Sequence, residues 1–156
     1  MAIFKTSAGR SVLHCHVGPN ADPCLEREWT LAEKAVKRAE MAADHPKAVE
    51  VRVPSARYNC FGYAYTASHG WFNKPDFFIA DDFLPVSMAN AKPGDVLVYE
   101  DDVEITHSAF VNQVTNGTII KVRSKWGRVA AFIHDPKDVP EEYGQAVRLI
   151  RRKPLS

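Results

Sequence analysis

Cys60 is the residue whose type and position point most directly to chemistry. It opens a stretch in which Asn59 is a good helix N-cap residue and Gly70 offers a C-terminal stop. The residues at helical spacing after the cap are Cys60, Tyr63, Ala64 and Ala67. A cysteine at a helix N-terminus faces unpaired N–H groups that favour the thiolate, so this position predicts a nucleophile. The alternative is a small buried apolar residue, because free cysteines are among the most buried residue types.

A thiol nucleophile needs a base within hydrogen-bond reach, and the base needs a third polar group that orients it. Two of the six histidines fall in the second half of the chain, where strands are predicted. His107 begins one of these strands and His134 ends another. The alternative for His107 is an ordinary structural histidine whose ring nitrogens are satisfied by neighbours.

The composition that must support such a site is that of an ordinary globular chain. The 156 residues are 46% hydrophobic and 25% charged, with a formal net charge of +1, which predicts one domain and no nucleic-acid partner. No apolar run could span a bilayer, and the N-terminus lacks the apolar core of a secretory signal. We therefore expect no membrane partner, cytoplasmic synthesis, and any export by a signal-peptide-independent route. Three cysteines, an odd number, indicate free thiols.

The N-terminal part is predicted to be an irregular segment followed by an amphipathic helix, together residues 1–48. Residues 24–43 carry an apolar stripe opposite a charged face. That stripe consists of Leu25, Trp29, Ala32, Ala35, Val36 and Ala39. The candidate metal ligands before it are His14, Cys15, His16 and Cys24. Their spacing matches no usual zinc pattern, so we expect no metal site and no cofactor.

Residues 49–156 complete the single domain and contain most of the predicted strands. The strands are expected at 49–53, 96–99, 105–114, 118–123, 129–134 and 146–152. Asn116-Gly117 is the strongest hairpin signal in the chain. Residues 70–90 are rich in aromatic residues, Asp and Pro, and are predicted to fold over the core as a loop or a short helical turn. A helical part followed by an antiparallel meander predicts an α+β fold.

The order of these elements resembles the papain-like hydrolases of the NlpC type over residues 56–126. The matching motifs are Asn-Cys at a helix start, Pro-Gly-Asp-Val-Leu-Val-Tyr entering a strand, and Thr-His-Ser-Ala-Phe-Val entering the next. The resemblance implies N-terminal helices packed on an antiparallel sheet, with Cys60 as nucleophile, His107 as base and Gly94-Asp95 as a strand start. The Ser-Lys-Trp-Gly turn also resembles an uncharacterised bacterial branch of such proteins.

The chain departs from the family pattern at two places. Phe61 stands between the cysteine and the glycine, and the third catalytic residue is either Ser124 or His134. The substrate-binding positions that we assign are Tyr58, Asn59, Trp71 and Trp126.

The activity implied by the resemblance is hydrolysis or acyl transfer at an amide bond by a Cys-His thiolate mechanism. The candidate substrates are a peptide, a peptidoglycan stem peptide and a glutamine side chain of a protein. Without a signal, such a chain could be a bacterial effector toxin with a cognate immunity or target protein. The alternative is a catalytically inactive papain-like binding module, an immunity or adaptor protein, that uses the aromatic residues between Trp71 and Phe83 as its interface.

Overall fold

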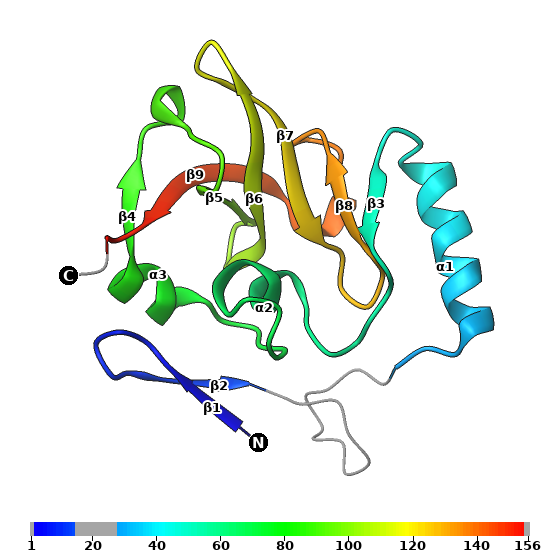
Figure 1. Ribbon diagram of the computed structural model, residues 1–156, viewed down its shortest axis with the longest axis horizontal. Coiled ribbons are helices and arrows are strands. Elements are labelled where there is room, and N and C mark those ends of the chain that lie inside the picture. The colour runs from blue at the N-terminus through cyan, green and yellow to red at the C-terminus, as the bar shows by residue number, and fades with distance from the viewer. Residues whose placement is uncertain (1, 15–27, 155–156) are drawn as a thin grey trace.

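A seven-stranded antiparallel sheet dominates the computed structural model, which describes residues 2–14 and 28–154. Its strands are β3 (Val49–Arg52), β4 (Phe83–Val86), β5 (Val96–Glu100), β6 (Ile105–Thr115), β7 (Thr118–Lys125), β8 (Ala131–His134) and β9 (Gln145–Arg152). Their order across the sheet is β3-β8-β7-β6-β5-β9-β4, and every neighbouring pair is antiparallel (Figure 1). The predicted series of strands from β5 to β9 is therefore confirmed.

The predicted α+β fold, with N-terminal helices packed on an antiparallel sheet, is wrong. The fold is mostly β, and the described residues contain only three short α-helices. They are α1 (Leu31–Asp44), α2 (Cys60–Tyr65) and α3 (Asp76–Asp82). The N-terminal helix α1 has no buried residue and lies beside β3 at one edge of the sheet (Figure 1).

The prediction failed at α1 because its apolar stripe does not face the sheet. A capping box between Thr30 and Glu33 sets the helix start, several residues later than predicted. The stripe residues within α1 are all exposed, Val36 to 58%, whereas Met41, outside the stripe, is half-buried. The stripe consists mainly of alanines, which bury too little apolar area to fix the orientation of a helix.

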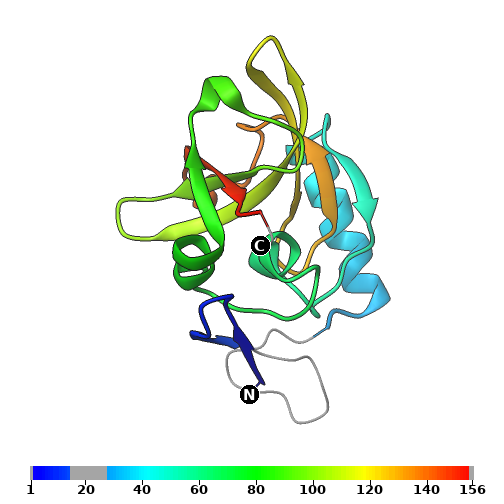
Figure 2. The same ribbon diagram turned by 60° about the vertical axis from the view of Figure 1, so that its left-hand side comes forward.

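Residues 2–14 also differ from the prediction of an irregular segment. They form a hairpin of β1 (Ala2–Lys5) and β2 (Ser11–His14), which lies next to α2 and α3 (Figures 1 and 2). Arg10 holds it there with a 2.7 Å ion pair to Asp81, and the backbone N–H of Ser7 donates to Asp82 at 3.1 Å. The hairpin thus depends on a helix distant in sequence, which local periodicity does not reveal.

Turn chemistry decided the β6–β7 hairpin, as the sequence predicted. Asn116 and Gly117 both have positive φ, 51° and 74°, as a tight turn that matches the strand twist requires.

The last strand, β9, does not continue the meander. Instead of pairing with β8, β9 returns to the far side of the sheet and pairs with β5 and β4.

The core lies on both faces of the sheet. On one face Val96 and Val98 pack with residues of α2 and α3, and on the other Leu97 and Val122 pack with the chain that follows β8. Two 3-10 turns, η1 (Met88–Asn90) and η2 (Glu141–Tyr143), complete the fold. None of the helices in the described part of the chain is long and apolar enough to cross a membrane.

Candidate active site

Asn59 fixes the start of α2, and with it the position of Cys60. Its Oδ1 accepts the backbone N–H of Gly62 at 3.0 Å, while its Nδ2 donates to the carbonyl of Phe72 at 2.7 Å. The predicted N-cap is thus confirmed, although α2 ends at Tyr65 and does not reach Gly70. With both polar atoms engaged and only 6% of its surface exposed, Asn59 supports the start of the helix.

The thiol of Cys60 is buried, with 5% of the residue exposed. Burial raises its pKa to about 12, while the backbone N–H groups of Ser108 and Phe61 and the charge of Lys125 oppose that rise. Cys60 is therefore a thiol at neutral pH in this structure. The surroundings nevertheless include the N–H groups and the cation that would stabilise a thiolate once it formed.

His107 is completely buried beside two aromatic rings. Its imidazole stacks on Tyr143, with centroids 4.1 Å apart and planes inclined by 6°, and meets Tyr99 edge-on at 5.2 Å. Neither ring nitrogen has a hydrogen-bond partner, so the structure shows no hydrogen bond between His107 and Cys60. Burial lowers the pKa of His107 well below its usual value, and nearby His134 lowers it further, which keeps the ring neutral.

The alternation of β6 explains the relative placement of Cys60 and His107. Successive side chains of a strand point to opposite faces. Ser108 points toward α2, where its hydroxyl lies 2.8 Å from the hydroxyl of Tyr65, whereas His107 points toward Tyr99 and the η2 turn. Cys60 reaches the backbone of β6 at Ser108, one residue from His107. The thiol therefore lies on the α2 side of β6, whereas the imidazole points to the opposite side.

Ser124 and His134, the two candidates for the third residue, bind each other. The Nδ1–H of His134 donates to the carbonyl of Asp135 at 2.7 Å, so Nε2 is free to accept from the Ser124 hydroxyl at 2.6 Å. The indole N–H of Trp126 donates to the same hydroxyl at 2.9 Å. The network is buried and complete, and neither candidate bonds to His107 in this structure.

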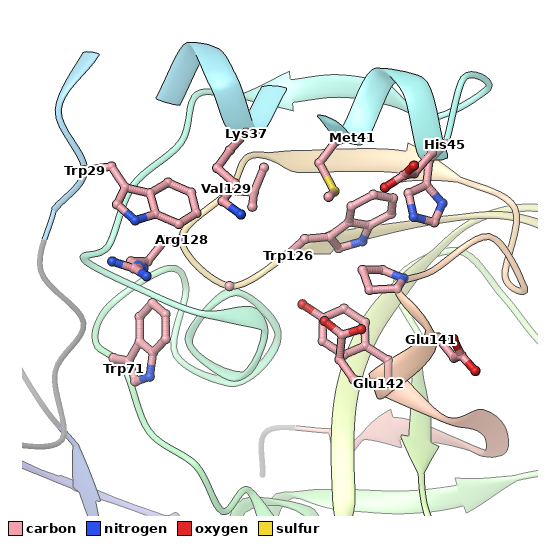
Figure 3. A pocket seen from close by; sticks show the side chains of 14 residues that line it. Trp29, Lys37, Met41, His45, Trp71, Trp126, Arg128, Val129, Glu141 and Glu142 are labelled. Atoms are coloured by element: carbon pink, nitrogen blue, oxygen red, sulfur yellow. The ribbon is translucent and has the colours of Figure 1, made fainter. Parts of the chain in front are cut away.

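A pocket of about 430 Å³ lies beside Trp126, directly after the end of β7. Figure 3 shows Trp29, Arg128 and Trp71 on one side of it and Glu141 and Glu142 on the other. Two residues assigned to substrate binding, Trp71 and Trp126, line the pocket, as does Tyr143, which separates it from His107.

The fourth assigned substrate position, Tyr58, lies in the core and does not line this pocket. It is 8% exposed and stacks on Tyr63 at a centroid distance of 6.2 Å. Together with Asn59, it belongs to the segment that holds α2.

The aromatic segment proposed as a protein interface is mostly core. Trp71, Phe72, Phe78 and Phe83 are between 2% and 9% exposed. Phe77 is 44% exposed, but the Arg10 guanidinium covers its ring at 4.1 Å. This leaves the binding-module alternative without the exposed aromatic surface on which it depended.

Sequence reasoning missed Lys125 and Tyr143. Lys125 is fully buried and donates to three backbone carbonyls, yet in the sequence it stood inside a predicted turn. Tyr143 followed two glutamates between the last two predicted strands. For Lys125, its place directly before a tryptophan at the end of a strand was a usable signal, because a lysine there must either leave the core or find partners inside it.

The described residues hold no group of three or more His, Cys, Asp or Glu side chains placed to bind a metal ion. Of the candidate ligands near the N-terminus, Cys15, His16 and Cys24 lie outside the described residues, as does the side chain of His14.

Comparison with known proteins gives a family but no activity. A family model described as Domain of unknown function (DUF7689) matches residues 51–151, and the chain therefore belongs to this family. No curated protein and no solved structure matches the chain. The matched range includes Cys60, His107, Ser124 and His134, so the candidate site lies within the family's domain.

Proposed function

We propose that this DUF7689 protein is a cysteine-dependent hydrolase or acyltransferase of amide bonds, with Cys60 as nucleophile and His107 as base. The observation that carries the proposal is the unsatisfied imidazole of His107. A buried polar atom without a partner costs about 1–3 kcal/mol, so two on one ring call for an explanation. A ring kept free to receive a proton supplies one, and in the proposed reaction the imidazole turns from the Tyr99 side of β6 toward the thiol.

The chemistry begins from an uncharged pair, because burial raises the pKa of Cys60 to about 12 and lowers that of His107. The proton moves from the sulfur to a ring nitrogen of His107 as the sulfur attacks the amide carbonyl. The amine then leaves with that proton, and a thioester remains. Attack by water releases the acid and restores the thiol, whereas attack by another amine or alcohol transfers the acyl group.

The surroundings of the thiol support this course. The N–H groups of Phe61 and Ser108 and the ammonium of Lys125 stabilise negative charge on sulfur. The pocket beyond Tyr143 offers room for a peptide or protein amide, and its tryptophans suit an extended chain. The effector role and the cognate immunity or target protein stay predictions, because nothing in the site bears on them.

The proposal is tested by peptide-resolved labelling of Cys60 with iodoacetamide between pH 6 and 9.5. Loss of the base in His107→Ala should slow labelling about tenfold or more. The control is His69→Ala, which removes an exposed histidine close to α2 in sequence. Release of amine from a panel of peptides and glutamine amides should disappear in Cys60→Ser. Equal labelling of wild type and His107→Ala, or amine release by Cys60→Ser, would overturn the proposal.

A further inference from the structure

Lys125 is a charged side chain with no exposed surface. Its Nζ donates to the carbonyl oxygens of Ser55, Tyr58 and Gly127 at 2.6, 3.1 and 2.5 Å. Three carbonyls can only accept, and a neutral amine has only two N–H groups, so the arrangement requires the ammonium form. Burial opposes that form and lowers the pKa of Lys125 to about 7, while Cys60 and Glu28 raise it.

The three acceptors come from two segments that build the site. Ser55 and Tyr58 belong to the connection that enters α2, so their carbonyls fix the chain just before Cys60. Gly127 belongs to the turn after β7, which lines the pocket. The ring of Tyr58 adds a cation–π contact, with Nζ 4.7 Å from its centroid. Lys125 thereby links the segment that precedes α2 to the end of β7.

Lys125 also differs in charge from the other ionisable groups around Cys60. Tyr65 on α2 and Tyr143 on η2 both interact electrostatically with the thiol and are neutral, because burial raises their pKa values. His107 on β6 is neutral as well. Among the groups that interact electrostatically with Cys60, Lys125 is the one that carries positive charge, since Glu28 and Lys34 beyond it form a pair at 3.0 Å.

We infer that Lys125 is a positioning residue of the Cys60 site, which holds the entry to α2 in place and provides the buried positive charge that stabilises the thiolate. This rests on the proposed function, because it assigns Lys125 a place in the same reaction. The residue touches neither the substrate nor the transferred proton. It acts through the geometry and the ionisation of Cys60.

Replacing the lysine separates its charge from its hydrogen bonds. Lys125→Gln keeps two N–H donors for the carbonyls without the charge, Lys125→Met removes both, and Lys125→Arg keeps a cation. The matched control is Lys121→Met, which removes a lysine from the same strand, where Nζ pairs with Asp135 at 2.6 Å. The readout is the rate of Cys60 alkylation by iodoacetamide against pH, on variants whose circular dichroism matches wild type.

We expect Lys125→Gln and Lys125→Met to alkylate about tenfold more slowly below pH 7, where Lys125 carries its charge, which corresponds to a rise of about one unit in the thiol pKa. Above pH 7 the difference should become smaller as the lysine loses its proton. Lys125→Arg should recover most of the rate, and Lys121→Met should leave it unchanged. If Lys125 only held the entry to α2 in place, its replacement would expose Cys60, and alkylation would become faster instead of slower.

Faster or unchanged alkylation in the folded neutral variants would overturn the inference, and so would a wild-type Cys60 that does not react below pH 9.5. If both neutral variants fail to fold, Lys125→Arg decides: alkylation of Cys60 at the wild-type rate below pH 7 supports the inference, and clearly slower alkylation there overturns it. The failure of the proposed function is distinguishable, because it shows as an unchanged rate in His107→Ala whatever the lysine variants do.

Discussion

The ring of Tyr143 lies flat on the imidazole of His107, with centroids 4.1 Å apart and planes inclined by 6°. The backbone carbonyl of Tyr143 also accepts the hydroxyl of Thr106, which ties η2 to the start of β6. Since Tyr143 lines the pocket as well, its ring is the wall between the pocket and the imidazole. Access to His107 from the pocket therefore requires this ring to move.

Removal of the Tyr143 ring should open the site to reagents that enter from the pocket. An aromatic stack contributes about 1 kcal/mol, so Tyr143→Ala should speed the alkylation of Cys60 roughly tenfold, provided that the pocket is the route of entry. Tyr143→Phe keeps the stack and should label like wild type. Peptide-resolved mass spectrometry measures both rates, and equal rates in all three proteins would show that reagents reach Cys60 by another path.

The Ser124 hydroxyl is expected to stabilise the fold more than the reactivity of Cys60. Ser124→Ala leaves the indole N–H of Trp126 and the Nε2 of His134 without partners, which should lower the free energy of unfolding by about 2 kcal/mol or more. Urea denaturation measures the loss, with the exposed Thr118→Ala as a control of small effect. A Cys60 labelling profile that changes in folded Ser124→Ala would instead place Ser124 among the residues that orient His107.

The buried histidines should make the protein sensitive to acid. Burial lowers the pKa of His134 to about 4, and an unfolded histidine titrates near 6.5. Between these values the unfolded chain binds more protons than the folded one, so stability is full above pH 6.5 and falls as the pH drops toward 4. The shift of 2.5 units corresponds to about 3 kcal/mol.

The acid effect is measured as the free energy of unfolding in urea at a series of pH values. His107 contributes in the same direction, because burial lowers its pKa as well. In His134→Gln the slope between pH 6.5 and 4 should become smaller, even if the variant is less stable at neutral pH. A slope identical to wild type would mean that His134 is not a neutral buried group.

The ion pair of Arg151 with Asp95 should be needed for stability. Asp95 is 3% exposed and receives two bonds from the Arg151 guanidinium, at 2.7 and 2.9 Å. Arg151→Ala leaves the buried carboxylate of Asp95 without its cation and should lower the free energy of unfolding, measured in a urea titration, more than the loss of an exposed pair does. The control Arg148→Ala breaks an exposed pair with Glu100 on the same strand, for which we expect less than about 1 kcal/mol. Equal losses in the two variants would contradict the prediction.

Gly62 allows α2 to lie against the chain that follows it. A Cβ at this position would stand 2.1 Å from the carbonyl oxygen of Gly70, so Gly62→Ala should cost about 3 kcal/mol or more, or prevent folding. Gly94→Ala is the matched control, because its Cβ would meet nothing within 4 Å and the cost arises only from its φ of +93°. That cost should be about 1–2 kcal/mol. Melting temperatures distinguish the two, and a stable Gly62→Ala would mean that α2 and Gly70 can separate.

The sequence by itself determined the features that depend on near neighbours. The Asn59 cap, the start of α2 at Cys60 and the Asn116-Gly117 hairpin follow from a few adjacent residues, because a cap or a tight turn requires particular side chains or φ values at particular positions. The strands from β5 to β9 were visible for a similar reason. Their apolar residues had to bury a face of a sheet.

Only the tertiary structure decided what each of these elements faces. The α1 stripe looks apolar but stays exposed, and β9 leaves the meander to pair with β5. Lys125 becomes a buried ammonium only because the carbonyl of Ser55, 70 residues away in sequence, comes within reach of its Nζ. Burial and electrostatic surroundings arise from contacts between distant segments. A local pattern could therefore place Cys60 at a helix start, but it could not tell whether the thiol is exposed, ionised or hydrogen-bonded to His107.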